Sequence, residues 1–397
     1  MQRRSRRTGW LAALALLVVA ALSLWLTGIG AHAWQTGRLL ADIARGYTDI
    51  AIERLPHPLV RTADGSAMSA DPEDAMPGAA IYPADLYLPP DRAFNDVARA
   101  AGLVLVPGAS PGGKDDPRLI DFAEILAAAG FVVLVPDLPG LRAQQVSPTH
   151  GADIAAAATY LSERLEGRPV AVAAISYAVG PAVLAAIGQD EPRPIALILG
   201  IGGYYDAVAT TVFITTGWIR NGDGVWEQRT PNEFGKWAFI RANLPRITSP
   251  GDRETLGEIA RRKLHDPAAD VSDLTALLGP EGRAVWQLLA NRDRDRVTSM
   301  IETLPPRVRD GLQGLDLAAR DISNLPATLL LVHGADDPIL PPEGSVALAA
   351  AVPHSELYRL VNLTHVDLSL DTFGDAWALY RACWSLIGWR NRLAGES

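Results

Sequence analysis

The sequence contains little cysteine and little positive charge. Cys383 is the one cysteine among 397 residues, which excludes an intramolecular disulfide and a metal cluster built from several cysteines. Asp and Glu number 45 against 36 Lys and Arg, giving a formal net charge of −9. Nucleic-acid binding requires a basic face, and this balance argues against one. No nucleic-acid partner is therefore expected.

Internal repeats and low-complexity tracts are also absent from the sequence, apart from alanine-rich helical segments. The composition is 48% hydrophobic and 20% charged, which excludes a disordered, collagenous or coiled-coil chain. A chain of 397 residues is long enough for one large domain or two modest ones.

Acidic residues are missing from residues 1–33, where four arginines occupy positions 3, 4, 6 and 7. No charged residue occurs between Thr8 and Gln35, and residues 10–29 are almost wholly apolar. About 20 such residues, at ~1.5 Å each, span the hydrocarbon core of a bilayer. Because arginines favour the cytoplasmic side, we expect a signal anchor over residues 1–33, with the catalytic part on the non-cytoplasmic side.

A cleaved signal peptide is the alternative to an anchor. Residues 31–33 have the A-x-A pattern that signal peptidase can cut, and the protein would then be exported after cleavage at Ala33. Arg6 and Arg7 also resemble part of a twin-arginine signal, but Gly9 stands where that motif prefers an aromatic residue.

The next segment, residues 34–78, is predicted to be a juxtamembrane helix (34–55) followed by a linker. From residue 79 on, short apolar runs alternate with helical segments, which predicts an α/β fold with a mostly parallel, doubly wound sheet. The expected strands lie at residues 81–90 (an edge strand), 102–107, 131–137, 170–175, 195–200, 327–333 and 356–361. Helical segments at residues 205–321 interrupt this pattern. They predict a helical cap inserted between a first core part (79–204) and a second (322–397).

A serine stands at one junction between a predicted strand and a helix, in the run Ala174-Ile175-Ser176-Tyr177-Ala178. A tight strand-to-helix turn lifts a serine hydroxyl above the sheet edge and leaves no room for large flanking side chains. The usual G-x-S-x-G pattern is A-x-S-x-A here. A serine nucleophile also needs an imidazole to accept its proton and a carboxylate to orient that imidazole.

Candidates for both partners follow later strands. The predicted strand at 327–333 opens into Asp336 and Asp337, and the one at 356–361 is followed by His365. Open α/β sheets place their functional sites at such C-terminal strand ends. The chain order serine, acid, histidine and the motif HGADDPILP resemble the α/β-hydrolase superfamily, in its serine esterase, lipase and dienelactone-hydrolase-like branches.

This resemblance covers residues 79–204 and 322–390 and implies an α/β-hydrolase fold. It implies that Ser176 is the nucleophile, Asp337 the acid and His365 the base.

The resemblance also implies an oxyanion hole, formed by the backbone N–H groups of Ala109 and Tyr177. Asp336 and Asp206 remain alternative positions for the acid. His333 ends a strand beside the acid, and we expect it to be a packed structural residue.

One motif points to a different chemistry. Gly108, Gly113 and Lys114 have the spacing of a nucleotide-binding P-loop. Asp115 occupies the position where a magnesium-binding Ser or Thr is needed, and with Asp116 it would repel phosphate. Nucleotide hydrolysis is therefore not expected.

The sequence thus predicts a serine hydrolase that cleaves a small-molecule or lipid-like carboxylic ester without a cofactor or a metal. A hydrolase of the same fold acting on a thioester, lactone or peptide bond is an alternative, as is a non-catalytic binding protein. The first part of the cap is rich in aromatic residues, which are expected to form mainly its own core: Phe213, Trp218, Trp226, Phe234, Trp237 and Phe239.

Overall fold

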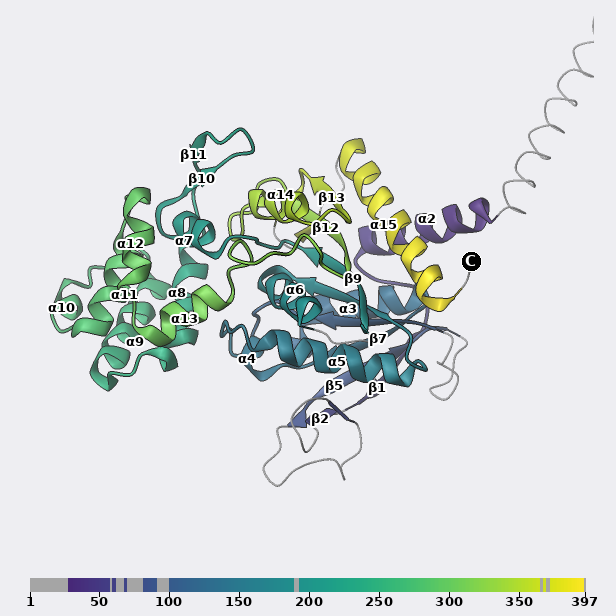
Figure 1. Ribbon diagram of the computed structural model, residues 1–397, viewed down its shortest axis with the longest axis horizontal. Helices are drawn as coiled ribbons and strands as arrows, with labels where there is room; N and C mark the ends of the chain where they lie inside the picture. Colours follow the sequence, from purple (N-terminus) through teal and green to yellow (C-terminus); the bar gives the residue numbers. More distant parts are fainter. Residues whose placement is uncertain are drawn as a thin grey trace, which may run out of the picture.

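The computed structural model describes residues 28–57, 59–61, 68–69, 81–90, 100–188, 193–364, 367–368 and 372–395. Within these residues, a sheet of eight strands forms the centre of the molecule (Figure 1). In spatial order its strands are β1 (Glu53–Pro56), β5 (Ala84–Leu88), β7 (Phe131–Pro136), β6 (Ala101–Val106), β8 (Val170–Ile175), β9 (Ile195–Ile201), β12 (Thr328–Gly334) and β13 (Ser355–Leu360). The pairs β1–β5 and β5–β7 are antiparallel, whereas the other neighbours run parallel. The predicted mostly parallel sheet is confirmed.

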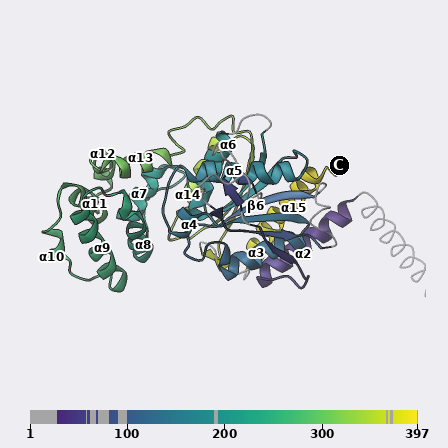
Figure 2. The ribbon, with the colours of Figure 1, turned by 90° about the horizontal axis from the view of Figure 1, so that it is seen from below.

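Helices cover both faces of this sheet (Figure 2). One face packs against α5 (His150–Arg164), α6 (Val179–Ile187) and α14 (Pro342–Ala351). The other packs against α2 (Ile29–Arg45), α3 (Pro117–Ala128) and α15 (Phe373–Ala394). Every residue of β6 and of β7 is buried, as expected for apolar strands with helices on both sides.

The N-terminal part differs from the prediction. The expected helix over 34–55 is α2, which begins earlier, at Ile29, and ends at Arg45, where Gly46 adopts a left-handed conformation with φ of 75°. Residues 53–56 instead form β1, which pairs with β5, so β5 is not the edge strand that the sequence predicted. The apolar and polar pattern of a four-residue strand is too short to distinguish it from a helix before its partner strand is known.

Short strands also occur where a linker was expected. The strands β2 (Leu59–Arg61), β3 (Met68–Ser69) and β4 (Ile81–Tyr82) form a small sheet in the order β3-β2-β4. Pro83 separates β4 from β5, because proline lacks the N–H group that a continuous ladder needs.

The predicted membrane span, residues 10–29, lies outside the described residues except for its last two positions. Among the residues that the structure does describe, no helix combines the length and the apolar character needed to cross a bilayer.

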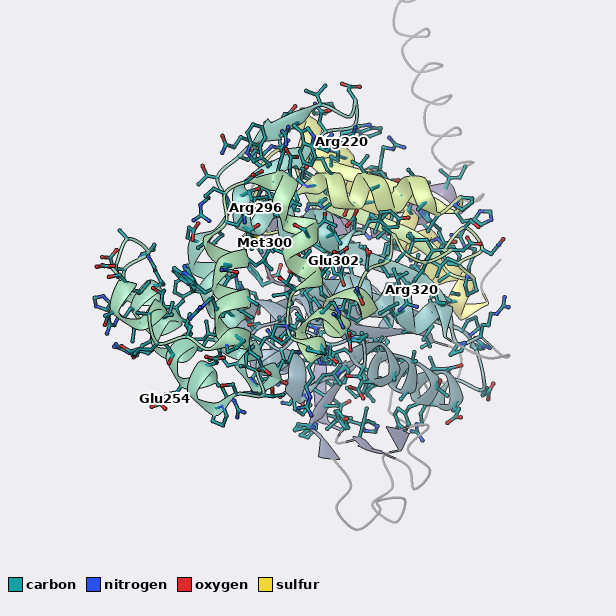
Figure 3. The ribbon with its side chains drawn as sticks, turned by 60° about the vertical axis from the view of Figure 1, so that its left-hand side comes forward. Arg220, Glu254, Arg296, Met300, Glu302 and Arg320 are labelled. Carbon is teal, nitrogen blue, oxygen red and sulfur yellow. The ribbon has the colours of Figure 1, made fainter. Side chains whose placement is uncertain are left out.

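The segment between β9 and β12 forms a mainly helical cap beyond one end of the sheet (Figure 1). Its elements are α7 (Ala207–Thr216), β10 (Trp218–Arg220), β11 (Trp226–Gln228), α8 (Glu233–Asn243), η5 (Leu244–Arg246), α9 (Pro250–His265), α10 (Ser272–Thr275), α11 (Pro280–Ala290), η6 (Arg294–Arg296), α12 (Val297–Glu302) and α13 (Pro306–Gly314). The cap has its own apolar core, which includes Leu256 and Ile259. Charged side chains such as Glu254, Arg296 and Glu302 point outward from it (Figure 3).

The cap aromatics have different environments. Trp237 belongs to the cap core and stacks on Trp286 with 6.1 Å between ring centroids. The Arg294 guanidinium lies over the rings of Trp218 and Trp226, at 4.8 and 4.6 Å from their centroids. Phe234 is 61% exposed. The expected aromatic core is therefore only partly formed by these residues.

Candidate active site

Ser176 lies directly after β8, where it opens the short 3-10 helix η4 (Ser176–Ala178) that leads into α6. Its φ is 56°, a left-handed conformation that side-chain-bearing residues rarely adopt. Ala174 and Ala178 on either side are fully buried, which explains the need for small residues there. Such strain at the end of a parallel strand is typical of a serine presented above the sheet edge.

The loop after β6 approaches this turn closely. A Cβ atom added to Gly108 would lie 3.3 Å from the Cβ of Ser176 and 3.3 Å from the carbonyl oxygen of Ile175. Gly108, Ala109, Ser176 and Tyr177 all line one cavity. The two residues predicted to form an oxyanion hole are therefore close neighbours of the serine turn, on the two loops that the prediction named.

Tyr177 also fixes a neighbouring loop through its side chain. Its hydroxyl accepts a hydrogen bond from the Ser147 N–H at 2.7 Å and donates one to the Ser147 carbonyl at 3.0 Å. The Tyr177 ring stacks on Tyr204, with 6.4 Å between centroids. Burial raises the pKa of the Tyr177 hydroxyl, which therefore stays neutral and serves as a structural group. These contacts give η4 a rigid support that the sequence did not predict.

The P-loop-like spacing has a structural explanation. Residues Gly113–Asp115 form the 3-10 helix η3. The Lys114 ammonium group makes ion pairs with Asp85 at 3.1 Å and Asp115 at 2.8 Å, and Arg54 also contacts Asp85, at 2.6 Å. The lysine that a phosphate would need is thus engaged by carboxylates. This network instead ties the loop after β6 to β1 and β5.

Asp337 is buried in the loop after β12, whereas Asp336 is exposed. One Asp337 carboxylate oxygen, Oδ1, accepts hydrogen bonds from the backbone N–H groups of Ile339 at 2.8 Å and Leu340 at 3.0 Å. These bonds fix the orientation of the carboxylate. Asp206, the other alternative acid, caps α7 by accepting from the Ala209 N–H at 2.7 Å.

His365 lies outside the described residues, so its position relative to Ser176 and Asp337 stays a prediction. The chain leading to it is described as far as β14 (Leu363–Thr364), which pairs with β15 (Asp367–Leu368). A Cβ atom on Gly334, at the end of β12, would lie 1.8 Å from the Leu363 carbonyl oxygen. The segment before His365 is therefore packed tightly against the strand that leads to Asp337.

His333 is fully buried, and both of its ring nitrogens have partners. Its Nε2 donates to the Leu340 carbonyl at 2.9 Å, and its Nδ1 accepts from the Ser345 hydroxyl at 2.7 Å. Because a carbonyl can only accept, this geometry assigns the proton to Nε2. His333 is thus engaged in packing contacts around the acid loop.

The cavity at the serine has a volume of about 920 Å³, within the size range of small-molecule sites. On the cap side it is lined by residues of α7, α8 and α13, including Phe234 and Lys236, and by Asn232, which caps α8. The loop Pro338, Ile339 and Leu340 lines the same cavity, which brings the acid loop and the serine turn to one space.

Two further features were not predicted from the sequence. Lys236 is buried in the cavity wall, where its ammonium group pairs with Glu233 at 2.6 Å, and burial lowers its pKa. The cavity also extends to α2, α3 and α15 on one face of the sheet. The residues involved are far apart in sequence, and no local pattern marks them.

Among the residues that the structure describes, no group of three or more His, Cys, Asp or Glu side chains could hold a metal ion. Cys383 is buried in α15, and burial raises the pKa of its thiol to about 12. It is therefore a packing residue.

No protein-family model matches the sequence, and no curated protein matches it either. Solved structures to which the chain is similar include a 2-hydroxy-6-oxo-6-phenylhexa-2,4-dienoate hydrolase from Rhodococcus sp., at 14% identity and a TM-score of 0.37, matching 87% of this chain and 100% of that one. An alpha/beta hydrolase fold protein from Nakamurella multipartita has 18% identity and a TM-score of 0.38, matching 85% and 100%. A puromycin-hydrolyzing peptidase from Mycobacterium tuberculosis has 13% identity and a TM-score of 0.44. That match covers 86% of this chain, which spans 40% of the peptidase.

Several features of the chain itself identify its fold. These are the strand order with two antiparallel pairs at one end, a serine at positive φ directly after β8, and an aspartate loop after β12. A cap is inserted between β9 and β12, beyond the edge at which the parallel strands end. With this architecture, the chain has the fold of the α/β-hydrolase superfamily.

Proposed function

We propose that the protein is a serine hydrolase that cleaves carboxylic esters through an acyl-enzyme intermediate. The observation that carries this proposal is the positive φ of Ser176 at the end of β8, facing a cavity also lined by Ala109 and Tyr177. A residue is held in such a conformation only where the surrounding structure imposes it, and functional sites are where such strain gathers.

In the proposed reaction, the Ser176 hydroxyl attacks the ester carbonyl carbon while His365 accepts its proton. The carbonyl oxygen becomes an oxyanion, which the N–H groups of Ala109 and Tyr177 stabilise. Collapse of this intermediate expels the alcohol, which takes the proton from His365 and leaves the acyl group on Ser176. Water, activated by the same histidine, then releases the carboxylic acid.

Asp337 is proposed to orient the imidazole of His365. Its Oδ1 atom is fixed by the N–H groups of Ile339 and Leu340, and its burial limits competition from water. A carboxylate held in this way can keep an imidazole in one tautomer and stabilise the imidazolium that forms.

A fluorophosphonate probe tests the enzymatic part of this proposal. Wild-type protein should become labelled at Ser176 and should hydrolyse p-nitrophenyl acetate, whereas Ser176→Ala should do neither. An intact, folded wild-type protein that neither labels nor cleaves the acetate would favour a non-catalytic binding role. Labelling combined with cleavage of a peptide or thioester but of no carboxylic ester would assign the site to another bond.

We also propose that the leader anchors the protein in a membrane, with the hydrolase on the non-cytoplasmic side. Residues 31–33, the alternative cleavage site, lie inside α2. Within them, the His32 ring makes a 3.0 Å hydrogen bond to the Trp384 carbonyl and lies 4.1 Å from the Trp384 ring. Cleavage there would remove contacts between α2 and α15, which supports retention of the leader.

The outer face of α15 also supports this location. Four aromatic residues recur on it at helical spacing, Phe373, Trp377, Tyr380 and Trp384, opposite the buried side that includes Leu379. Phe373 is 85% exposed and Trp377 54% exposed. Aromatic rings favour the boundary between headgroups and acyl chains. We call these four residues the α15 aromatic stripe and propose that it rests on the bilayer surface.

A further inference from the structure

The cavity at Ser176 extends in two directions. Towards the cap, its lining combines the polar side chains of Asn232 and Lys236 with several apolar side chains of α7, α11 and α13. On the side of α2, α3 and α15, its lining includes Phe122, Leu379 and Ala382, whose side chains are hydrocarbon. We call this second side the α15 wall.

The α15 wall lies where close packing is expected. Leu379, Ala382 and Leu386 are buried members of the core on this face of the sheet, and yet they border open space. Protein interiors are packed as densely as organic crystals, and voids much larger than a water molecule are few. An apolar space of this kind inside a core, continuous with a reactive serine, is well suited to an apolar part of the substrate.

The part of the cavity along the α15 wall opens at the protein surface. Arg45 and Gly46, at the end of α2, and Arg118 and Asp121, near the start of α3, line the same cavity and are exposed or half-buried. A chain that entered along the α15 wall would therefore pass from the serine, through apolar surroundings, towards a polar rim. A long aliphatic group requires such apolar surroundings along its length.

We propose that the α15 wall binds the acyl chain of the substrate, which is an amphiphilic ester of a medium- or long-chain aliphatic acid. The alcohol portion then lies towards the cap, where the lining offers both polar and apolar side chains. This inference rests on the proposed ester hydrolysis, and it specifies the class of ester. It also gives α2 a role in the site, because Ile43 contributes to the lining.

Kinetics with p-nitrophenyl esters of increasing acyl length test the proposal. For the full-length wild-type protein, kcat/KM should rise by about fourfold for each added methylene. This ratio corresponds to the free energy of transferring one methylene from water to an apolar surface. Ala382→Leu adds bulk to the α15 wall and should lower the ratio of octanoate to acetate kcat/KM at least tenfold. Ala378→Leu is the matched control, since Ala378 lies on the same helix but does not line the cavity. It should leave that ratio unchanged.

Binding of cis-parinaric acid, a fluorescent fatty acid, separates this inference from the proposed reaction. Ser176→Ala should bind the probe, and adding Ala382→Leu should weaken binding at least tenfold while Ala378→Leu has no effect. Probe binding that depends on Ala382, in a protein that cleaves no ester, would retain the α15 wall and reject the hydrolysis. Acetate cleavage with a flat chain-length profile and no probe binding would reject the α15 wall alone.

Discussion

His333 Nε2 lies 3.4 Å from Asp337 Oδ2, but it donates its proton to the Leu340 carbonyl at 2.9 Å. The imidazole is therefore a neighbour of the proposed catalytic carboxylate without being its hydrogen-bonded partner. Together with the Ser345 contact to Nδ1, this leaves His333 no free ring nitrogen with which to accept a proton from Ser176.

The first prediction tests whether His365 or His333 is the base that accepts the proton of Ser176. His333→Phe leaves the buried Leu340 carbonyl and Ser345 hydroxyl without this partner, and should lower the free energy of unfolding by about 1–3 kcal/mol in urea titrations. The folded variant should still react with the fluorophosphonate probe. His365→Ala should keep wild-type stability within ~1 kcal/mol but lose labelling. The assignment of the base would be reversed if His333→Phe abolished labelling and His365→Ala retained it.

The second prediction concerns Gly334. Its missing side chain allows the Leu363 carbonyl to approach, because a Cβ atom there would lie 1.8 Å from that oxygen. Gly334→Ala should displace the chain before His365, lower kcat for p-nitrophenyl acetate at least tenfold and destabilise the fold by about 1–3 kcal/mol. Gly222→Ala is the control, since a Cβ atom at Gly222 meets no atom within 4 Å. Equal activity of the two variants would show that the contact does not position the histidine loop.

The parts of the fold found from the sequence are those with a local signal. The apolar runs that became β6, β7, β8 and β9 each specify a buried strand by themselves, and the small residues around Ser176 mark the turn. The expected strand 356–361 likewise agrees with β13 to within one residue at each end.

The parts of the fold that could not be predicted from the sequence depend on contacts between residues far apart in the chain. β1 is a strand because Leu55 pairs with Leu86 on β5, and neither residue reveals this alone. The α15 wall joins Ile43, Phe122 and Ala382 from three separate helices. Sequence patterns identify which side chains are apolar, but the space between them is set only when the helices pack.

The third prediction is a loss of stability in mild acid caused by His150. Burial, and secondly the positive charge of Arg246, lower the pKa of this imidazole from 6.5 to about 4. The unfolded chain binds the proton more readily, so the neutral His150 contributes stability above about pH 6.5. This contribution should fall as the pH drops from 6.5 towards 4, by up to about 3 kcal/mol.

Urea unfolding of wild type and His150→Gln between pH 7.5 and pH 4.5 measures this effect. Glutamine keeps polar atoms at the site but does not titrate in this range, so the variant should show a shallower pH dependence. His265→Gln is a suitable control, because His265 is exposed at the end of α9. Parallel pH profiles for wild type and His150→Gln would mean that folding does not lower the pKa of this imidazole.

The fourth prediction concerns the α15 aromatic stripe. The single cysteine allows one nitroxide label to be placed at a chosen position in a Cys383→Ser background. In the full-length protein reconstituted into phosphatidylcholine and phosphatidylglycerol vesicles, a label at Trp377→Cys should collide more often with dissolved oxygen than with a water-soluble nickel complex, because oxygen concentrates in the apolar layer. A label at Leu277→Cys, a cap position that is 71% exposed, should show the opposite preference. If both labels favoured the nickel complex, the stripe would lie in water and α15 would not rest on the bilayer.

The α15 aromatic stripe and the α15 wall lie on opposite sides of the same helix. A lipid-exposed Trp377 would therefore also place the proposed acyl site within one helix diameter, about 10–12 Å, of the membrane surface.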